Sequence, residues 1–215
     1  QLTVSSNIDH IDCYGDSTGS IDVTVSGGFF PYVYLWSDGT ATEDIYNLSE
    51  GSVSCSIIDY LGCEISEFFI INEEMPIQTI VSINSVSCYG GNDGSASLNI
   101  SGGVNPYNID WYNIDENNLS EGTYLYEITD DNGCTFQDSI YVLQEDSLDI
   151  TINVIDLNCT GNPEGEISIS ISSGGVPPYV FSWMGPNSFT SSQEDIDNLY
   201  AGLYMLTLED ANGCV

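Results

Sequence analysis

The chain has 215 residues, 33 acidic side chains, no lysine or arginine, and a formal net charge of −33. With no cation to neutralise phosphates, we expect neither nucleic acid nor an anionic lipid surface as a partner. A hydrophobic content of 41% argues for a folded chain, and no apolar run approaches the roughly 18 residues of a membrane span, so no direct membrane insertion is expected. Three roles for the charge remain open: self-repulsion that keeps a long chain extended, recruitment of Ca²⁺, and a surface that lacks the cleavage sites of Lys- or Arg-directed proteases.

One stretch of sequence occurs three times. It reads GSIDVTVSGGFFPYVYLW at 19–36, GSASLNISGGVNPYNIDW at 94–111 and GEISISISSGGVPPYVFSW at 165–183. Its first half alternates apolar and polar residues, which predicts a strand with one buried face. The Gly-Gly pair and the proline after it predict a turn into a second strand. The chain therefore consists of three tandem repeats, at 1–74, 75–145 and 146–215.

The third repeat is shorter than the first two. The chain starts at Gln1 and stops one residue after Cys214, where the earlier copies continue with a further strand. We expect an excerpt of a longer protein, with the last strand of repeat 3 missing.

The second strand of the recurring stretch is expected to bury alternate side chains. The expected core positions are Tyr32, Tyr34, Trp36, Tyr107, Ile109, Trp111, Tyr179, Phe181 and Trp183. A later motif, L-x-x-G-x-Y, ends at Tyr124 and Tyr204 and resembles the tyrosine corner of immunoglobulin-like sandwiches, although repeat 1 has Val53 instead. The sequence thus predicts an all-β fold of tandem immunoglobulin-like β-sandwich repeats.

Six of the seven cysteines occupy equivalent positions, two in each repeat. They are Cys13, Cys88 and Cys159 before the recurring stretch, and Cys63, Cys134 and Cys214 after a D-x-x-G turn. This regularity indicates an oxidising compartment and repeats that are each disulfide-stapled. Pairing within repeats (Cys13–Cys63, Cys88–Cys134, Cys159–Cys214) is the favoured prediction, and the alternative joins Cys63 to Cys88 and Cys134 to Cys159, both 25 residues apart.

Residue types argue against enzyme activity. The only histidine, His10, has no counterpart in the other repeats and is read as a solvent-facing strand residue rather than a catalytic base. Paired carboxylates are plentiful, but no large shared insertion would build a glycosidase cleft. The odd cysteine, Cys55, falls on a predicted buried face and is interpreted as a small core residue, with a reactive thiol as the alternative.

Acidic residues recur in the two cysteine-containing turns. They are Asp16, Asp93 and Glu164 after the first cysteine, and Asp59, Asp130 and Asp210 before the second. Within-repeat disulfides would bring these turns together, and carboxylate oxygens are the ligands that Ca²⁺ prefers, so bound Ca²⁺ is a possible cofactor and no other is expected. The favoured interpretation is that the aspartates before the second cysteine cap their turns through hydrogen bonds.

Some aromatic side chains fall outside the predicted core. Tyr14, Tyr46, Tyr89, Tyr112 and Tyr200 are candidates for stacking on sugars. Polysaccharide recognition by the repeats is therefore an alternative function.

The order of motifs strongly resembles the SprB-type repeat of giant surface adhesins of gliding bacteria. Repeat 3 carries SSGGVPPYVFSW, NLYAGLY and DANGC, and repeat 2 carries CYGGNDGSASL, SGGVNPY, NLSEGTY and DDNGC. Repeat 1 departs at Val53 and Leu61, where the pattern prefers Tyr and Asn. The resemblance covers the whole chain and implies export by the type IX secretion system, a long filament attached to the outer membrane at the cell surface, and a role in adhesion and gliding motility.

On this basis we expect a structural stalk segment whose partners are neighbouring repeats of the same chain. The alternatives are that the repeats themselves adhere to extracellular polysaccharide or an abiotic surface, directly or through bridging Ca²⁺, or that they form a passive coat. The resemblance also suggests O-glycosylation at D-[ST]-hydrophobic patterns, which places candidate sites at Ser17, Ser139 and Ser147.

Overall fold

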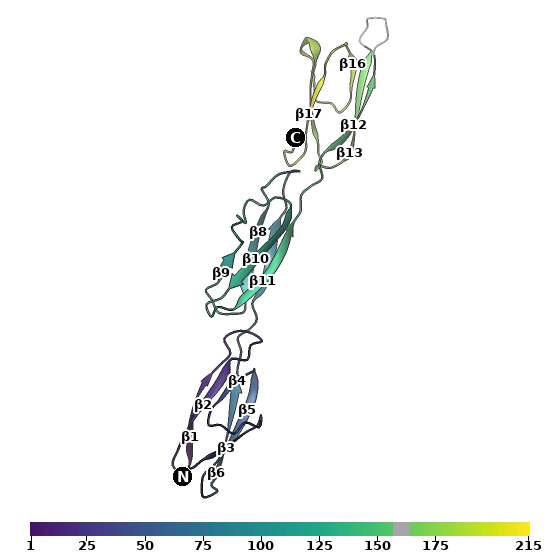
Figure 1. The fold of residues 1–215 in the computed structure, drawn as a ribbon. Coiled ribbons are helices and arrows are strands. Elements are labelled where there is room, and N and C mark those ends of the chain that lie inside the picture. Colours follow the sequence, from purple (N-terminus) through teal and green to yellow (C-terminus); the bar gives the residue numbers. More distant parts are fainter. Residues whose placement is uncertain (157–163) are drawn as a thin grey trace. The chain divides into compact units, whose positions relative to one another are not determined.

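The computed structural model describes residues 1–156 and 164–215, and strands make up nearly all of the regular structure in these ranges (Figure 1). Contacts divide the chain into two compact units. Unit 1 comprises residues 1–80, 99–110 and 126–138, and unit 2 comprises 81–98, 111–125 and 139–215. Neither unit coincides with one sequence repeat, so the repeat boundaries stay a prediction. No helix in the described ranges has the length and apolar composition needed to cross a bilayer.

Repeat 1 is a sandwich of two antiparallel three-stranded sheets. One sheet has the order β1-β2-β4 and the other β3-β5-β6. The strands are β1 (Thr3–Asp9), β2 (Gly19–Ser26), β3 (Val33–Trp36), β4 (Ile45–Leu48), β5 (Gly51–Ile58) and β6 (Glu64–Ile71). Strands one, two and four along the chain thus face strands three, five and six, which is the division between sheets in an immunoglobulin-like sandwich. The predicted all-β, immunoglobulin-like fold is confirmed.

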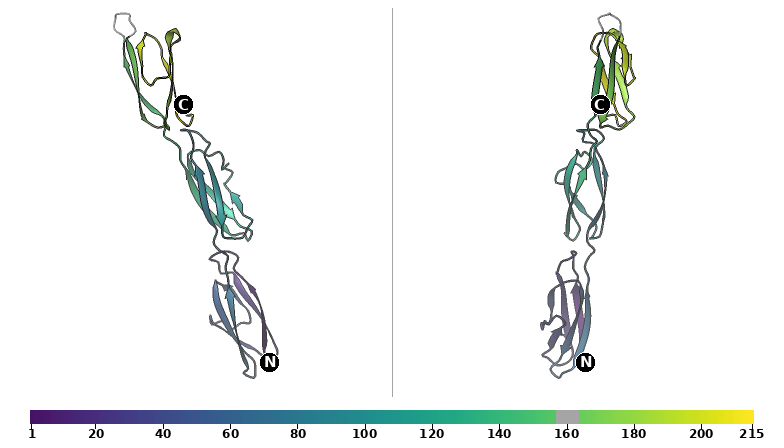
Figure 2. Two further views of the ribbon diagram at one scale, coloured as in Figure 1. Left: turned by 180° about the vertical axis from the view of Figure 1, so that it is seen from behind. Right: turned by 90° about the vertical axis from the view of Figure 1, so that its right-hand side faces the viewer.

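The later repeats follow the same plan. In repeat 2, β7 (Gln78–Asn84) pairs with β8 (Ser95–Ser101), and the second sheet has the order β11-β10-β9, formed by Thr135–Val142, Gly122–Thr129 and Asn108–Asp110. In repeat 3 the sheets are β12-β13-β16 and β15-β14-β17. Their strands are β12 (Asp149–Ile155), β13 (Gly165–Ser173), β14 (Val180–Met184), β15 (Thr190–Ser191), β16 (Ile196–Leu199) and β17 (Met205–Glu209), with a 3-10 turn at Pro186–Ser188. Figure 2 shows the strands of each repeat from two further sides.

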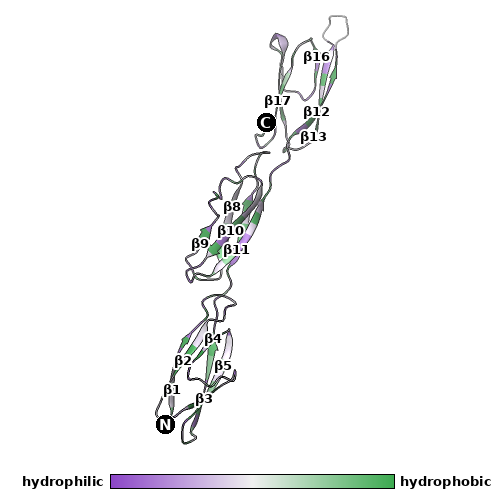
Figure 3. Cartoon of the chain, in the orientation of Figure 1, coloured by the Kyte–Doolittle hydropathy of each residue, from purple (hydrophilic) through white to green (hydrophobic). Residues whose placement is uncertain are grey.

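The core lies between the two sheets of a repeat and is built by the alternating strands. Apolar residues interrupted by polar ones are visible along the strands in Figure 3. In repeat 1, Ile21, Val23 and Trp36 are buried, and the Trp36 ring lies 5.6 Å from that of Phe69 between ring centroids. The prediction for Ile109 is wrong, because this side chain of the three-residue strand β9 is 41% exposed.

The Gly-Gly turn is fixed by a close approach of the chain to itself. A Cβ atom on Gly27 would lie 2.0 Å from the carbonyl oxygen of Gln1, and one on Gly102 would lie 2.0 Å from that of Pro76. Both glycines also have positive φ, at 77° and 74°, so any side chain would be strained as well as obstructed. The turn therefore seats the first residues of a repeat against its second-strand hairpin.

The predicted tyrosine corner is present in repeats 2 and 3. The Tyr124 hydroxyl donates to the carbonyl oxygen of Ser120 at 3.0 Å, and the Tyr204 hydroxyl donates to that of Tyr200 at 3.1 Å. Repeat 1 has Val53 at this position and no hydroxyl to make the bond.

Replacing Tyr124 by Phe removes only the corner hydroxyl. We expect the free energy of opening of β10 to fall by about 1 kcal/mol, the usual net worth of one neutral hydrogen bond. Amide hydrogen exchange along β10 measures this. Tyr60→Phe is the matched control, since that side chain is 73% exposed, and equal exchange in both variants would show that the corner bond contributes nothing.

Candidate functional site

A buried aspartate shapes the turn that carries the second cysteine of each repeat. Asp59 is only 5% exposed, yet its carboxylate is fully used. Its Oδ1 accepts the N–H groups of Leu61 and Cys63, both at 2.9 Å, and its Oδ2 accepts the N–H of Phe29 at 3.1 Å. Phe29 lies just after the Gly-Gly pair, so one carboxylate holds together the D-x-x-G turn and the glycine turn.

The same arrangement recurs at Asp130 and Asp210. The Asp130 carboxylate accepts the N–H groups of Val104 at 2.9 Å and Cys134 at 2.8 Å. The Asp210 carboxylate accepts those of Val176 at 2.8 Å and of Asn212 and Cys214, both at 2.9 Å. The interpretation of these aspartates as turn caps is confirmed.

Backbone hydrogen bonds lower the pKa of two of these carboxyl groups. For Asp59 the N–H of Cys63 is the main cause, and for Asp210 it is the N–H of Val176; in both cases burial works in the opposite direction without prevailing. The charged form is therefore the one that the folded turn selects.

In repeats 1 and 2 the first cysteine lies in a turn that is hydrogen-bonded to the end of the same repeat. The Ile11 N–H donates to the Asn72 carbonyl at 2.9 Å, and the Gly15 N–H donates to Glu73 Oε2 at 2.8 Å. In repeat 2, the Val86 N–H donates to the Leu143 carbonyl and the Gly90 N–H to Gln144 Oε1, both at 2.8 Å. The sequence analysis missed Glu73 and Gln144, although each lies two residues after the end of the last strand of its repeat.

The disulfides join consecutive repeats, so the predicted pairing within repeats is wrong. Cys13 is bonded to Cys134, with their Cα atoms 5.5 Å apart, and Cys88 is bonded to Cys214, with their Cα atoms 5.4 Å apart. The alternative prediction, which joined Cys63 to Cys88 and Cys134 to Cys159, is also wrong. The first bond lies wholly within unit 1 and the second within unit 2.

The geometry of β6 explains why Cys13 cannot reach Cys63. Cys63 immediately precedes β6, whereas the turn of Cys13 is hydrogen-bonded to Asn72, just past the other end of that strand. Eight residues of strand span about 26 Å at roughly 3.3 Å per residue, whereas a disulfide requires Cα atoms within about 7 Å. The two cysteines of repeat 1 therefore lie at opposite ends of its sandwich.

An asparagine side chain adds a hydrogen bond beside each disulfide, at the joint between one repeat and the next. The Asn132 side chain donates from Nδ2 to the carbonyl of Asp12 at 3.3 Å, and that of Asn212 donates to the carbonyl of Ser87 at 3.2 Å. Asp12 and Ser87 each directly precede the incoming cysteine. The amide therefore holds the backbone beside the disulfide, a role that sequence analysis did not assign.

Three cysteines lie outside these two bonds. Cys63 is exposed and carries a free thiol. Cys159 lies outside the described residues. Cys55 is free and fully buried in the core of repeat 1, and burial raises the pKa of its thiol, which confirms its interpretation as a core residue.

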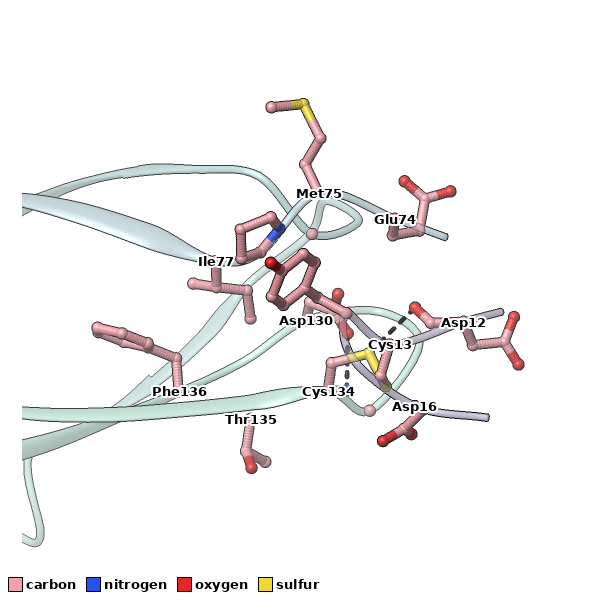
Figure 4. A pocket seen from close by; sticks show the side chains of 14 residues that line it. Asp12, Cys13, Asp16, Glu74, Met75, Ile77, Asp130, Cys134, Thr135 and Phe136 are labelled. Atoms are coloured by element: carbon pink, nitrogen blue, oxygen red, sulfur yellow. Dashed lines mark hydrogen bonds between the residues drawn. A yellow bond between two sulfur atoms is a disulfide. The ribbon is translucent and has the colours of Figure 1, made fainter. Parts of the chain in front are cut away.

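A pocket adjoins each disulfide. The pocket at Cys13–Cys134 has a volume of about 430 Å³ and is lined by residues that include Asp12, Tyr14, Met75 and Phe136. Figure 4 shows the disulfide at its wall with Asp130 beside it. A pocket of about 460 Å³ lies at Cys88–Cys214 in unit 2, with Tyr89 in the position equivalent to Tyr14.

The acidic residues proposed for Ca²⁺ are distributed differently from the expectation. Asp16 lines the pocket with Asp130 of the next repeat, not with Asp59. The carboxylates of Asp12, Asp16 and Glu74 point away from one another in Figure 4. Asp93 accepts the N–H of Ser87 at 3.0 Å and its hydroxyl, and that hydroxyl contact is the main reason its pKa is lowered. No group of three or more His, Cys, Asp or Glu suited to a metal ion occurs within 1–156 and 164–215, where Glu164 is exposed.

Other predicted positions are at the surface. His10 is exposed and its Nδ1 accepts the N–H of Asn72 at 3.2 Å. The five tyrosines proposed for sugar stacking, Tyr14, Tyr46, Tyr89, Tyr112 and Tyr200, are between 46% and 63% exposed. Ser17, Ser139 and Ser147 are exposed as well, so their glycosylation stays a prediction.

The lowered pKa values predict acid sensitivity of the turns. A carboxyl group whose pKa is lower in the folded state contributes stability above its unfolded pKa of about 3.9, and this contribution disappears as the pH falls through the folded pKa. We expect Asp59→Asn to be less stable than the parent at pH 7 and to lose less stability between about pH 4 and pH 2. Urea unfolding midpoints across this pH range measure the effect, with Asp22→Asn, an exposed carboxylate of β2, as the control. Parallel pH profiles for parent and Asp59→Asn would contradict the assignment.

One known protein family matches the three repeats of the chain. A model of the SprB repeat matches residues 5–41, 80–116 and 151–188, which together make up just over half of the chain. None of the curated proteins compared matches the chain. Among solved structures, the crystal structure of Dpr2 Ig1-Ig2 in complex with DIP-Theta Ig1-Ig3 is similar at 13% identity and a TM-score of 0.30, over 88% of this chain and 81% of that one. The SprB repeat family is typical of non-enzymatic structural domains and implies an extracellular or cell-surface protein. With three matches in register with its three copies, the chain belongs to the SprB repeat family.

Proposed function

We propose that this chain is a structural stalk segment of a long extracellular adhesin filament that serves surface adhesion and gliding motility. The observation that supports it most is the pairing of Cys13 with Cys134 and of Cys88 with Cys214, because each bond joins one repeat to the next. A disulfide inside each repeat would stabilise single domains. These bonds instead add a second covalent connection between neighbouring domains, beside the peptide linker. We infer export by the type IX secretion system and attachment at the outer membrane from the family alone.

The proposed mechanism is resistance to tension. Cys13–Cys134 closes a loop of 121 residues and Cys88–Cys214 one of 126, and the loops overlap from 88 to 134. In the chain-entropy model, closing a loop of this length stabilises the folded state by about 5 kcal/mol. Under tension, most of the unfolded chain would remain slack within the loops. Uniform negative charge would keep neighbouring filaments apart.

The polar groups of the joints support a structural role over a catalytic one. The recurring aspartates are engaged by backbone N–H groups, and the only histidine accepts the N–H of Asn72. We therefore propose that the segment is not an enzyme and that its partners are neighbouring repeats of the same filament.

Pulling the chain from its two ends tests the stalk mechanism. With both disulfides intact, residues 1–13, 88–134 and 214–215 carry the tension, which permits about 210 Å of extension at roughly 3.6 Å per residue, against about 770 Å for the reduced chain. Single-molecule force spectroscopy with and without reductant measures both lengths. Cys13→Ser should extend to about 320 Å, and Cys63→Ser should match the parent. Full extension of the oxidised chain would refute the mechanism.

A second candidate function is direct adhesion to polysaccharide. Tyr14 and Tyr89 favour it, because each is exposed, at 60% and 63%, and each lines the pocket beside a disulfide. Aromatic faces at a recurring pocket offer a platform on which sugar rings can stack.

Bead retention separates adhesion from a stalk role. Beads coated with the chain are placed under flow on polysaccharide and on glass, with Ca²⁺ and then with chelator. If the repeats adhere, retention should fall severalfold in Tyr14→Ala/Tyr89→Ala and remain in Tyr46→Ala/Tyr200→Ala, which removes two exposed rings that do not line these two pockets. Retention no better than that of bare acidic beads would contradict adhesion by the repeats and would leave the stalk role as the one supported function.

A further inference from the structure

The free thiol of Cys63 lies in a turn with the same construction as the turns of the two bonded second cysteines. Its N–H donates to Asp59 at 2.9 Å, as those of Cys134 and Cys214 donate to their aspartates at 2.8 and 2.9 Å. The Asp59 N–H donates to the Cys63 carbonyl at 3.0 Å, and the equivalent distance is 3.0 Å in both other repeats. At both equivalent positions this turn holds a first-cysteine turn of another repeat through a disulfide.

The residues around Cys63, which we call its seat, are also arranged like those around Cys134. A Cβ atom on Gly28 would lie 2.8 Å from Leu2 and 2.9 Å from Asp59. One on Gly103, in the occupied seat around Cys134, would lie 2.8 Å from Ile77 and 2.7 Å from Asp130. Leu2 and Ile77 are equally buried, at 8% exposure. A glycine, a buried apolar side chain and the turn aspartate therefore pack together in the seat of Cys63 as they do in the seat of Cys134, which binds the turn of Cys13.

The rim of this seat is apolar in repeat 1. Phe29, Phe30, Tyr60 and Leu61 are between 60% and 82% exposed. The Tyr60 N–H donates to the Phe29 carbonyl at 2.9 Å, which places the two turns next to each other. Leu61 stands where Asn132 and Asn212 hold the backbone before an incoming cysteine. Exposed apolar side chains grouped in this way are typical of an interaction surface.

We propose that Cys63 forms a disulfide with the Cys-Tyr-Gly turn of a further SprB repeat, with apolar contacts to Phe29 and Leu61 replacing the asparagine hydrogen bond. The two thiols lose two protons and two electrons, and a small-molecule disulfide such as oxidised glutathione takes them up and becomes two thiols. The inference rests on the proposed stalk function, which it extends to the next partner along the filament.

Thiol exchange with a turn peptide tests the proposal without an added oxidant. A peptide with the sequence of residues 11–19, IDCYGDSTG, carries glutathione on its cysteine as a mixed disulfide. The Cys63 thiolate attacks the peptide sulfur, the peptide–protein disulfide forms, and glutathione leaves as its thiolate. Intact mass, followed by Glu-directed digestion without reduction, gives the extent and the site of modification.

We expect the turn peptide to form the adduct at Cys63 about tenfold more favourably than a peptide of scrambled sequence, since only the former can bury apolar surface against the rim. Phe29→Ser and Leu61→Ser should each reduce this preference, whereas Tyr46→Ser should not. Cys63→Ser should lose the adduct at this site, and the buried thiol of Cys55 should stay unmodified. Equal reaction with both peptides, or a preferred Cys63–Cys63 dimer of two copies, would overturn the proposal. Because pulling tests only the two existing disulfides, a failed exchange leaves the stalk mechanism intact, and a failed pulling test leaves the exchange result interpretable.

Discussion

One buried carboxylate in each repeat holds the structure of the joints together. Asp59, Asp130 and Asp210 each accept N–H groups from two separate turns, so a single side chain fixes the position of the second cysteine relative to the glycine turn. The chain has no lysine or arginine to pair with a buried anion. Backbone N–H groups supply the compensating dipoles instead, and those that Asp59 and Asp210 accept lower the pKa of both carboxyl groups.

Side-chain oxygens that accept backbone N–H groups also form the contacts between the first-cysteine turns and the linkers. Glu73 and Gln144 receive the N–H groups of Gly15 and Gly90, so either a carboxylate or an amide oxygen serves at this position. What matters is an acceptor of the right length, not a charge. The turns of Cys13 and Cys88 are thereby held beside the last strand of their own repeat, and each disulfide joins such a turn to the second-cysteine turn of the next repeat.

The fold could be read from the sequence because its evidence is local. Alternation along 19–26 predicts the buried face of β2, and the spacing in L-x-x-G-x-Y predicts the hydroxyl bond of Tyr124. The disulfide partners could not be predicted in this way, because Cys13, Cys88 and the equivalent cysteines have similar neighbouring sequences. Those sequences would look the same whichever cysteines were paired. Choosing between them requires knowing which end of the sandwich each turn occupies, and that follows from the direction of β6, not from residue spacing. The burial of Ile109 was also mispredicted, because β9 is only three residues long and its alternation carries little information.

Because the two disulfide loops overlap, more than one covalent route connects the two ends of the chain. Between Cys13 and Cys134 a second covalent route bypasses every peptide bond, and between Cys88 and Cys214 another does the same. Hydrolysis of any one peptide bond from residue 13 to residue 214 therefore leaves both ends of the chain joined. With both disulfides intact, hydrolysis separates the two ends only after three cuts, one each within 13–88, 88–134 and 134–214, whereas after reduction one cut is enough. The lifetime of such a fibre under proteolysis therefore depends on coincident damage and not on the weakest single bond.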